Sequence, residues 1–227
     1  MADMKIVMVN KNYSSWSLRG WLGVKQTGAE FEEIIFDLWT DEFNDKIKRY
    51  SPTGCVPVLV DKDIYVWESI AILDYLDRKF PDCGIWPKES HLYAHAKAIS
   101  AEMHAGFFAL RGAAPMNLRE NRPYMDMDEK VKKDVARIEE IWTSCLESLG
   151  NVGPFLFGKF SGADMMYAPV VARLNGYGIK LNDTCMAYMD AVLNHPHMKE
   201  WYEAAAKETF TIPEDEIPAT QMVLIAP

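Results

Sequence analysis

The sequence has few cysteines and does not place them as a disulfide framework or a zinc site would require. Its 227 residues include four, Cys55, Cys83, Cys145 and Cys185, and no two of them form a C-x-x-C pair. Small secreted domains and zinc modules depend on closely spaced cysteines, so the sequence fits neither class. We expect reduced thiols.

Long hydrophobic runs and an excess of positive charge are also missing. No apolar run approaches the roughly 20 residues of a membrane-spanning helix, and the start, Met1 to Lys5, does not resemble a secretory signal. The 33 acidic residues outnumber the 24 basic ones, and the net charge of −9 repels a phosphate backbone. We therefore expect a cytoplasmic protein that has neither a membrane nor a nucleic acid as a partner.

The pattern of the chain changes after residue 81. Before this point short apolar runs alternate with helical periodicity, and beyond it the periodic segments are helical. A chain of 227 residues is long enough for two small domains. We predict an α/β domain over residues 1–81, a linker over 82–90 and an all-α domain over 91–227.

The stretch from Lys5 to Gly28 is typical of a strand, a turn and a helix. The apolar run 6–9 ends at Asn10, and Leu18 and Trp21 begin one apolar helix face after Ser14. A helix N-terminus favours an anion, and a serine hydroxyl can donate a hydrogen bond to it. The alternative interpretation is that Ser14 only caps the helix, as serine commonly does.

Further strand and helix patterns follow in the first domain. We predict strands over 31–38, 56–60 and 64–67, a helix over 41–50, and a helix that opens at Glu68-Ser69 and ends near Phe80. Most X-Pro bonds are trans, but because Pro57 heads the third strand beside the presumed site, we predict a cis Val56-Pro57 bond. Ser14, Val56-Pro57 and Glu68-Ser69 all lie at junctions of this small unit, and three such junctions can form one site.

Three motifs together resemble the glutathione transferase family. They are Ser14-Ser15-Trp16-Ser17-Leu18-Arg19, the segment Pro52-Thr53-Gly54-Cys55-Val56-Pro57-Val58-Leu59, and Glu68-Ser69-Ile70-Ala71-Ile72. The paired serines look most like the zeta class and its bacterial relatives. Trp16 stands where that class usually carries cysteine, which argues against a maleylacetoacetate isomerase.

The resemblance implies a thioredoxin-like N-terminal domain followed by a helical bundle, with glutathione as co-substrate. In such a protein Ser14 donates to the glutathione sulfur, Val56 pairs with the cysteinyl backbone, and Glu68 and Ser69 hold the γ-glutamyl end. The implied function is transfer of glutathione to a small hydrophobic electrophile by a homodimer. The alternatives are a glutathione-dependent isomerase or peroxidase, or a non-catalytic member that binds ligands or partner proteins.

The second half predicts two long helices. Apolar residues step by 4-3-4-3-4 over 92–110 and again over 131–149, so we expect an antiparallel pair. For the electrophile we consider Trp16, Met103, Phe107 and Arg111, with plain core or solvated helix surface as the alternative for each. We expect no metal, because His91 and His95 lack a third ligand.

Cys55 stands where many relatives with this turn carry a lysine that meets a glutathione carboxylate. Three interpretations are open: a lost cation, a buried apolar thiol, or a thiol that forms a mixed disulfide with glutathione. We rank them in that order.

Overall fold

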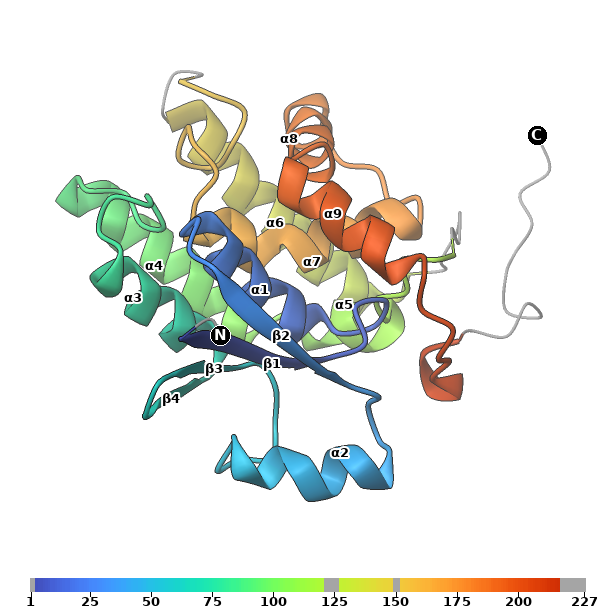
Figure 1. Ribbon diagram of the computed structural model, residues 1–227. Coiled ribbons are helices and arrows are strands. Elements are labelled where there is room, and N and C mark those ends of the chain that lie inside the picture. Colours follow the sequence, from blue (N-terminus) through green and yellow to red (C-terminus); the bar gives the residue numbers. More distant parts are fainter. Residues whose placement is uncertain (1–2, 121–126, 149–151, 217–227) are drawn as a thin grey trace.

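The computed structural model describes residues 3–120, 127–148 and 152–216. As predicted, an N-terminal part with a small mixed sheet precedes a helical C-terminal part (Figure 1). The proposed domain limits, 1–81 and 91–227, remain predictions, and residue 149 at the end of the second helical pattern lies outside the described residues.

The sheet has the strand order β2-β1-β3-β4. Its strands are β1 (Met4–Val9), β2 (Phe31–Phe36), β3 (Val58–Asp61) and β4 (Ile64–Trp67). β1 runs parallel to β2, with Val7 opposite Ile34, and antiparallel to β3, with Val7 opposite Val58. β3 begins two residues later than the predicted strand 56–60, because Pro57 has no N–H to donate to a neighbouring strand.

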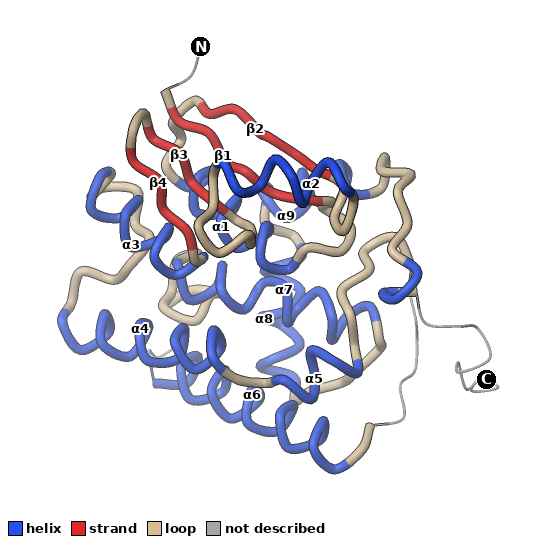
Figure 2. The backbone as a smooth tube through the Cα atoms, turned by 90° about the horizontal axis from the view of Figure 1, so that it is seen from below, coloured by secondary structure: helices blue, strands red, loops and turns tan. Residues whose placement is uncertain are grey.

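Alternation along the strands gives the sheet two apolar faces. Ile6 and Met8 of β1 point into the main core, where α1 (Ser15–Gln26) and α3 (Ser69–Lys79) cover the sheet. Val7 and Val9 point to the opposite face, which α2 (Asp41–Lys46) covers together with the 3₁₀ turn Ile47–Arg49. Figures 1 and 2 show α2 alone on its side of the sheet.

The C-terminal part is built around one buried helix. Its helices are α4 (Ser90–Ala105), α5 (Phe108–Ala113), α6 (Glu129–Ser148), α7 (Gly162–Gly176), α8 (Asp183–Leu193) and α9 (Pro196–Ala205), followed by a 3₁₀ turn at Pro213–Asp215. Most of α7 is buried, and the Asp164 carboxylate at its start accepts hydrogen bonds from the Ser161 backbone and hydroxyl. In the described ranges, no helix combines the length and apolar character needed to cross a bilayer.

The predicted antiparallel pair is confirmed, but one of its helices is shorter than predicted. Arg137 of α6 lies 2.8 Å from Glu102 of α4, and Cys145 lies 3.9 Å from His95, so the two helices run in opposite directions. The prediction of one continuous helix through Leu110 is wrong. α4 ends at Ala105, because Gly106 is extended and Phe107 is left-handed, with a φ of 59°.

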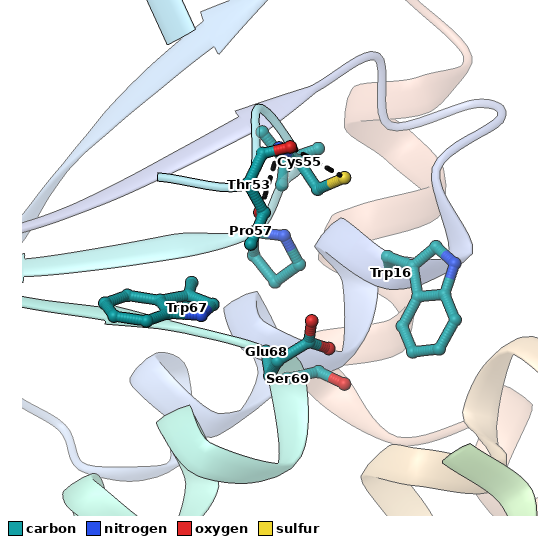
Figure 3. A pocket seen from close by; sticks show the side chains of 8 residues that line it. Trp16, Thr53, Cys55, Pro57, Trp67, Glu68 and Ser69 are labelled. Atoms are coloured by element: carbon teal, nitrogen blue, oxygen red, sulfur yellow. Dashed lines mark hydrogen bonds between the residues drawn. The ribbon is translucent and has the colours of Figure 1, made fainter. Parts of the chain in front are cut away.

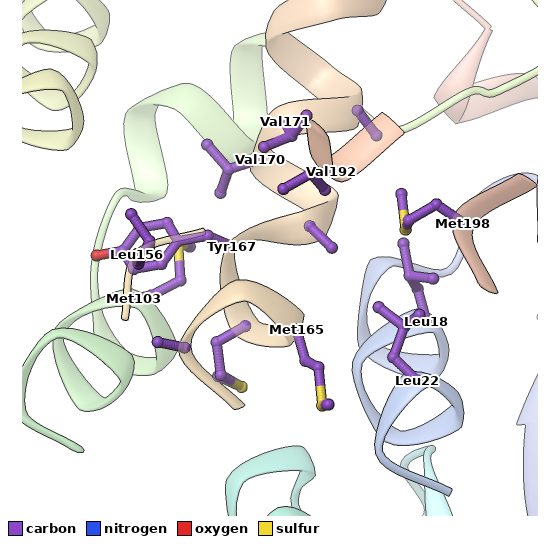
Figure 4. Packing of buried hydrophobic residues seen from close by; sticks show 14 of the residues in the cluster. Leu18, Leu22, Met103, Leu156, Met165, Tyr167, Val170, Val171, Val192 and Met198 are labelled. Atoms are coloured by element: carbon purple, nitrogen blue, oxygen red, sulfur yellow. The ribbon is translucent and has the colours of Figure 1, made fainter. Parts of the chain in front are cut away.

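Helix α1 joins the two parts. One side packs on α3 and another on α7. Figure 4 shows Met165 of α7 pointing toward Leu22 of α1, with Leu18 beside Met198 of α9. Because α1 also begins at the predicted site, the core fixes the position of its N-terminus.

Candidate functional site

A pocket of about 250 Å³ lies where the predicted junctions meet. It is lined by Trp16, Thr53, Cys55, Val56, Pro57, Trp67, Glu68 and Ser69 (Figure 3). Thr53 and Cys55 lie on one side of it and Glu68 and Ser69 on the other, with Trp16 and Trp67 at opposite ends. The structure thus brings together four residues that the family resemblance assigns to glutathione and one considered for the electrophile.

The Val56-Pro57 bond is cis, as predicted. Within the described residues, neither backbone polar group of Val56 has a hydrogen-bond partner. These groups lie at the pocket, so an extended ligand can pair with them as a strand would. Behind Pro57, helix α1 approaches closely: a Cβ added to Gly20 would lie 2.9 Å from the proline Cγ.

Glu68 occupies an unusual backbone conformation at the start of α3. Its φ is 68° and its ψ is 122°, a region that costs a non-glycine residue about 1–3 kcal/mol. Its half-exposed carboxylate lies 3.3 Å from Nε2 of His104 on α4. The next residue, Ser69, is fully buried and donates its hydroxyl to the sulfur of Met166, 3.8 Å away.

Ser14 caps α1, as one of the two interpretations predicts. Its Oγ accepts a hydrogen bond from the Ser17 N–H at 3.2 Å and donates one to the Ser17 hydroxyl at 2.7 Å. The side chain is largely buried and is not among those that line the pocket, although Trp16, two residues later, is. Its role as donor to a sulfur therefore stays a prediction.

Three arginines surround the start of α1. Arg173 is buried and donates from Nη2 to the Ser15 hydroxyl at 3.2 Å, and burial lowers its pKa to about 10. Arg19 is also buried and donates from Nε to the Met166 carbonyl at 2.9 Å. Burial, followed by the charges of Arg111 and Arg173, lowers the pKa of Arg19. This positive region adds to the helix N-terminus in favouring a negative charge nearby.

The indole of Trp16 contacts these cations. The guanidinium of Arg19 lies 4.5 Å from the ring centroid and that of Arg111 lies 4.9 Å from it. His104 meets the same ring edge-on, with centroids 5.2 Å apart. Cation–π contacts of this kind are attractive and favour this orientation of the Trp16 ring at the pocket wall.

The other residues considered for the electrophile lie outside the pocket lining. Met103 is 1 % exposed and belongs to the core, as the alternative interpretation had it. Phe107 is largely buried too. Arg111 is partly buried and donates from Nη2 to the carbonyls of Met103 and His104, where α4 ends. Their part in an electrophile site remains a prediction.

Cys55 is exposed at the edge of the pocket. Its sulfur lies 3.7 Å from the Thr53 carbonyl, and its N–H donates to the Ser51 and Thr53 hydroxyls. The interpretation of Cys55 as a buried apolar thiol is therefore wrong. The lost cation and the mixed disulfide stay open.

Trp67 and His104 are site residues that sequence reasoning missed. Trp67 directly precedes Glu68 at a strand end, and that position was a usable signal. No local sequence signal identifies His104 as a site residue, because its partner Glu68 is distant in the sequence. Among the described residues no three His, Cys, Asp or Glu side chains are grouped to hold a metal, and the expectation of a metal-free protein remains a prediction.

The chain matches known proteins over most of its length. Residues 13–79 match the N-terminal domain of glutathione S-transferases and residues 93–204 match the C-terminal domain. Glutathione S-transferase 1 of Dianthus caryophyllus is 28% identical over 203 residues, covering 86% of this chain and 90% of that protein. A probable maleylacetoacetate isomerase of Caenorhabditis elegans is 31% identical over 120 residues, covering 52% of this chain and 55% of that protein.

A solved structure supports the same assignment at the level of the fold. It is a glutathione transferase homolog from Burkholderia GL BGR1 with bound glutathione, and it superposes with a TM-score of 0.71 at 19% identity. The match covers 90% of this chain and 99% of that one. Since models of one family match both halves of the chain and the fold agrees with them, the chain belongs to the glutathione S-transferase family.

Proposed function

We propose that this protein is a glutathione transferase that binds glutathione in the pocket between Val56 and Glu68 and transfers it to a small hydrophobic electrophile. The observation that carries the proposal is the pocket itself. It offers backbone groups at Val56 that have no hydrogen-bond partner in the described part of the chain, it offers a carboxylate at Glu68, and it adjoins the N-terminus of α1. These groups match the amide backbone, the ammonium and the thiolate of glutathione.

The chemical task at such a site is to ionise the thiol. A free thiol has a pKa of about 8.5, so it is mostly protonated at neutral pH, whereas the thiolate is the nucleophile. A hydrogen bond from Ser14 together with the helix N-terminus would stabilise the thiolate by about 2–3 kcal/mol, or about one to two pKa units. In this role Ser14 turns its hydroxyl from Ser17 toward the sulfur, and the Arg173–Ser15 contact supplies positive charge nearby.

The related isomerase makes a glutathione-dependent isomerase the second candidate. The match to that relative covers about half of each protein. The paired serines fit an isomerase, whereas the bulky Trp16, which Arg19 and Arg111 contact, narrows the pocket at the position where the zeta class carries cysteine. A peroxidase, and a non-catalytic member that binds ligands or partners, complete the alternatives.

A binding titration followed by a substrate panel tests the proposal. We expect calorimetry to detect glutathione binding, and we expect turnover with glutathione and small halogenated or activated electrophiles. Turnover only with isomerisable substrates or only with peroxides would replace the transferase by the corresponding alternative. Absence of glutathione binding would favour the non-catalytic member.

We also propose a cytoplasmic, metal-free protein, and the free cysteines are compatible with a reducing location.

A further inference from the structure

The segment after α9 crosses the loop that leads into Ser14. This loop, residues 10–13, connects β1 to α1 and ends at the proposed thiol activator. Residues 208–216 contact it from the C-terminal end of the described chain, at sequence separations of up to 203 residues. Because these hydrogen bonds join residues so far apart in the sequence, they can fix the loop only once the whole chain has folded.

Glu208 makes the central contact. Its two carboxylate oxygens accept hydrogen bonds from consecutive backbone N–H groups, that of Lys11 at 2.7 Å and that of Asn12 at 2.9 Å. Nothing else in the described chain is bonded to these two N–H groups. A carboxylate that accepts two amide donors forms charge-assisted hydrogen bonds, which are stronger than neutral ones.

Arg119 and Glu216 bind the same loop through Tyr13. The Tyr13 hydroxyl donates to the Glu216 carboxylate and accepts from Nη2 of Arg119 at 2.7 Å. Arg119 also donates to the carbonyl of Glu208 at 2.6 Å and to that of Phe210 at 2.9 Å. One guanidinium therefore joins the C-terminal segment to the residue before Ser14.

The inner side of the loop is equally well fixed. Asn12 is fully buried, and its Oδ1 accepts from the N–H groups of Leu118 and Arg119 at 2.9 Å each. The carbonyl of Lys11 accepts from the Trp201 indole at 3.0 Å. The loop is thus held by the core on one side and by residues 208–216 on the other.

We propose that Glu208 is a positioning residue that fixes the loop 10–13 and thereby the direction of the Ser14 hydroxyl. The proposal rests on the proposed function of Ser14 as the donor to the glutathione sulfur. Because Ser14 directly follows Tyr13, release of the Lys11 and Asn12 amides lets the first turn of α1 shift at its capping end. Glu208 itself is not among the residues that line the pocket.

The test compares Glu208→Gln with Glu203→Gln. Glutamine keeps one acceptor oxygen and replaces the other with an NH₂ group, which cannot accept from an N–H. Glu203 is an exposed glutamate on α9 whose side chain has no hydrogen bond or ion pair among the described residues, so its variant controls for the loss of one charge. The measurements are hydrogen exchange of the Ser17 amide, which donates to Ser14, and the pKa of the thiol of bound glutathione from thiolate absorbance.

We expect Glu208→Gln to accelerate exchange at the Ser17 amide and to raise the pKa of the bound thiol by at least about half a unit, roughly a threefold loss of thiolate stabilisation. Glutathione affinity should change by less than about threefold, and Glu203→Gln should match wild type in every readout. Unchanged exchange at Ser17, or an unchanged thiol pKa despite binding, would overturn the proposal.

Two further measurements keep the test decisive. If Glu208→Gln does not fold, Glu208→Asp keeps the charge but shortens the side chain by one methylene group, so it should no longer reach both N–H groups, and the same two outcomes decide the proposal. If wild type does not bind glutathione, the proposed function fails, and exchange at Ser17 still reports whether Glu208 orders the Ser14 turn.

Discussion

The carboxylate of Glu68 lies 3.3 Å from Nε2 of His104 and so joins the proposed glutathione pocket to helix α4. Burial is the largest effect on His104 and lowers its pKa, while the Glu68 charge acts in the opposite direction. His104 is therefore neutral at pH 7 and above and becomes charged only as the pH falls below its ordinary value of 6.5.

This pair predicts how glutathione affinity depends on pH. Protonated His104 competes with the γ-glutamyl ammonium for the Glu68 carboxylate, so affinity should fall as the pH drops below about 6.5. His104→Ala should remove most of that fall, while the exposed His91→Ala should retain it. Calorimetric titrations at several pH values check this. An identical pH profile in wild type and His104→Ala would contradict the competition.

A second prediction concerns the close approach of α1 to Pro57. A methyl group at Gly20 would lie 2.9 Å from the Pro57 Cγ, so Gly20→Ala should displace the pocket wall and weaken glutathione binding. Gly112→Ala is the matched control, because a Cβ there meets nothing within 4 Å. The control should be neutral or stabilising by up to about 1 kcal/mol. Equal affinities in both variants would show that the wall tolerates the extra methyl group.

Cys55→Lys tests the missing cation. Since Cys55 is exposed, a lysine there would form at most a solvent-screened pair with a glutathione carboxylate, worth about 0.2–1 kcal/mol. We expect glutathione to bind up to about fivefold more tightly. Cys55→Ser, which adds no charge, should leave affinity unchanged. If lysine leaves the dissociation constant unchanged or raises it, Cys55 does not mark a lost cation.

We predict a two-fold homodimer, and the edge strand β4 offers a surface for it. Ile64 and Tyr65 on β4 and Tyr93 on α4 are large apolar side chains that are at least 43 % exposed. Tyr65→Lys should shift the mass toward a monomer in light scattering at micromolar concentration. Ile35→Lys, on the opposite edge strand, should not. A wild-type protein of monomer mass would refute the dimer.

Local sequence signals predicted the elements and the junctions, but not the contacts between distant segments. The strand-turn-helix pattern around Ser14 follows from neighbouring residues, whereas the cis bond at Pro57 was predicted only because three junctions were expected to form one site. The break at Gly106 had only a weak local signal, the low helix propensity of glycine. The Glu68–His104 pair and the Glu208 contacts join segments 36 or more residues apart, so they depend on the tertiary fold and not on local sequence.

The most direct test is the titration of the glutathione thiol on the protein. We predict that the thiol of bound glutathione has a pKa about one to two units below the free value of about 8.5, as followed by thiolate absorbance. In Ser14→Ala this pKa should return toward the free value, turnover should fall sharply, and glutathione affinity should change less, while the exposed Ser90→Ala should match wild type. An unshifted thiol pKa in wild type, or the same depressed pKa in Ser14→Ala, would contradict activation of glutathione by Ser14.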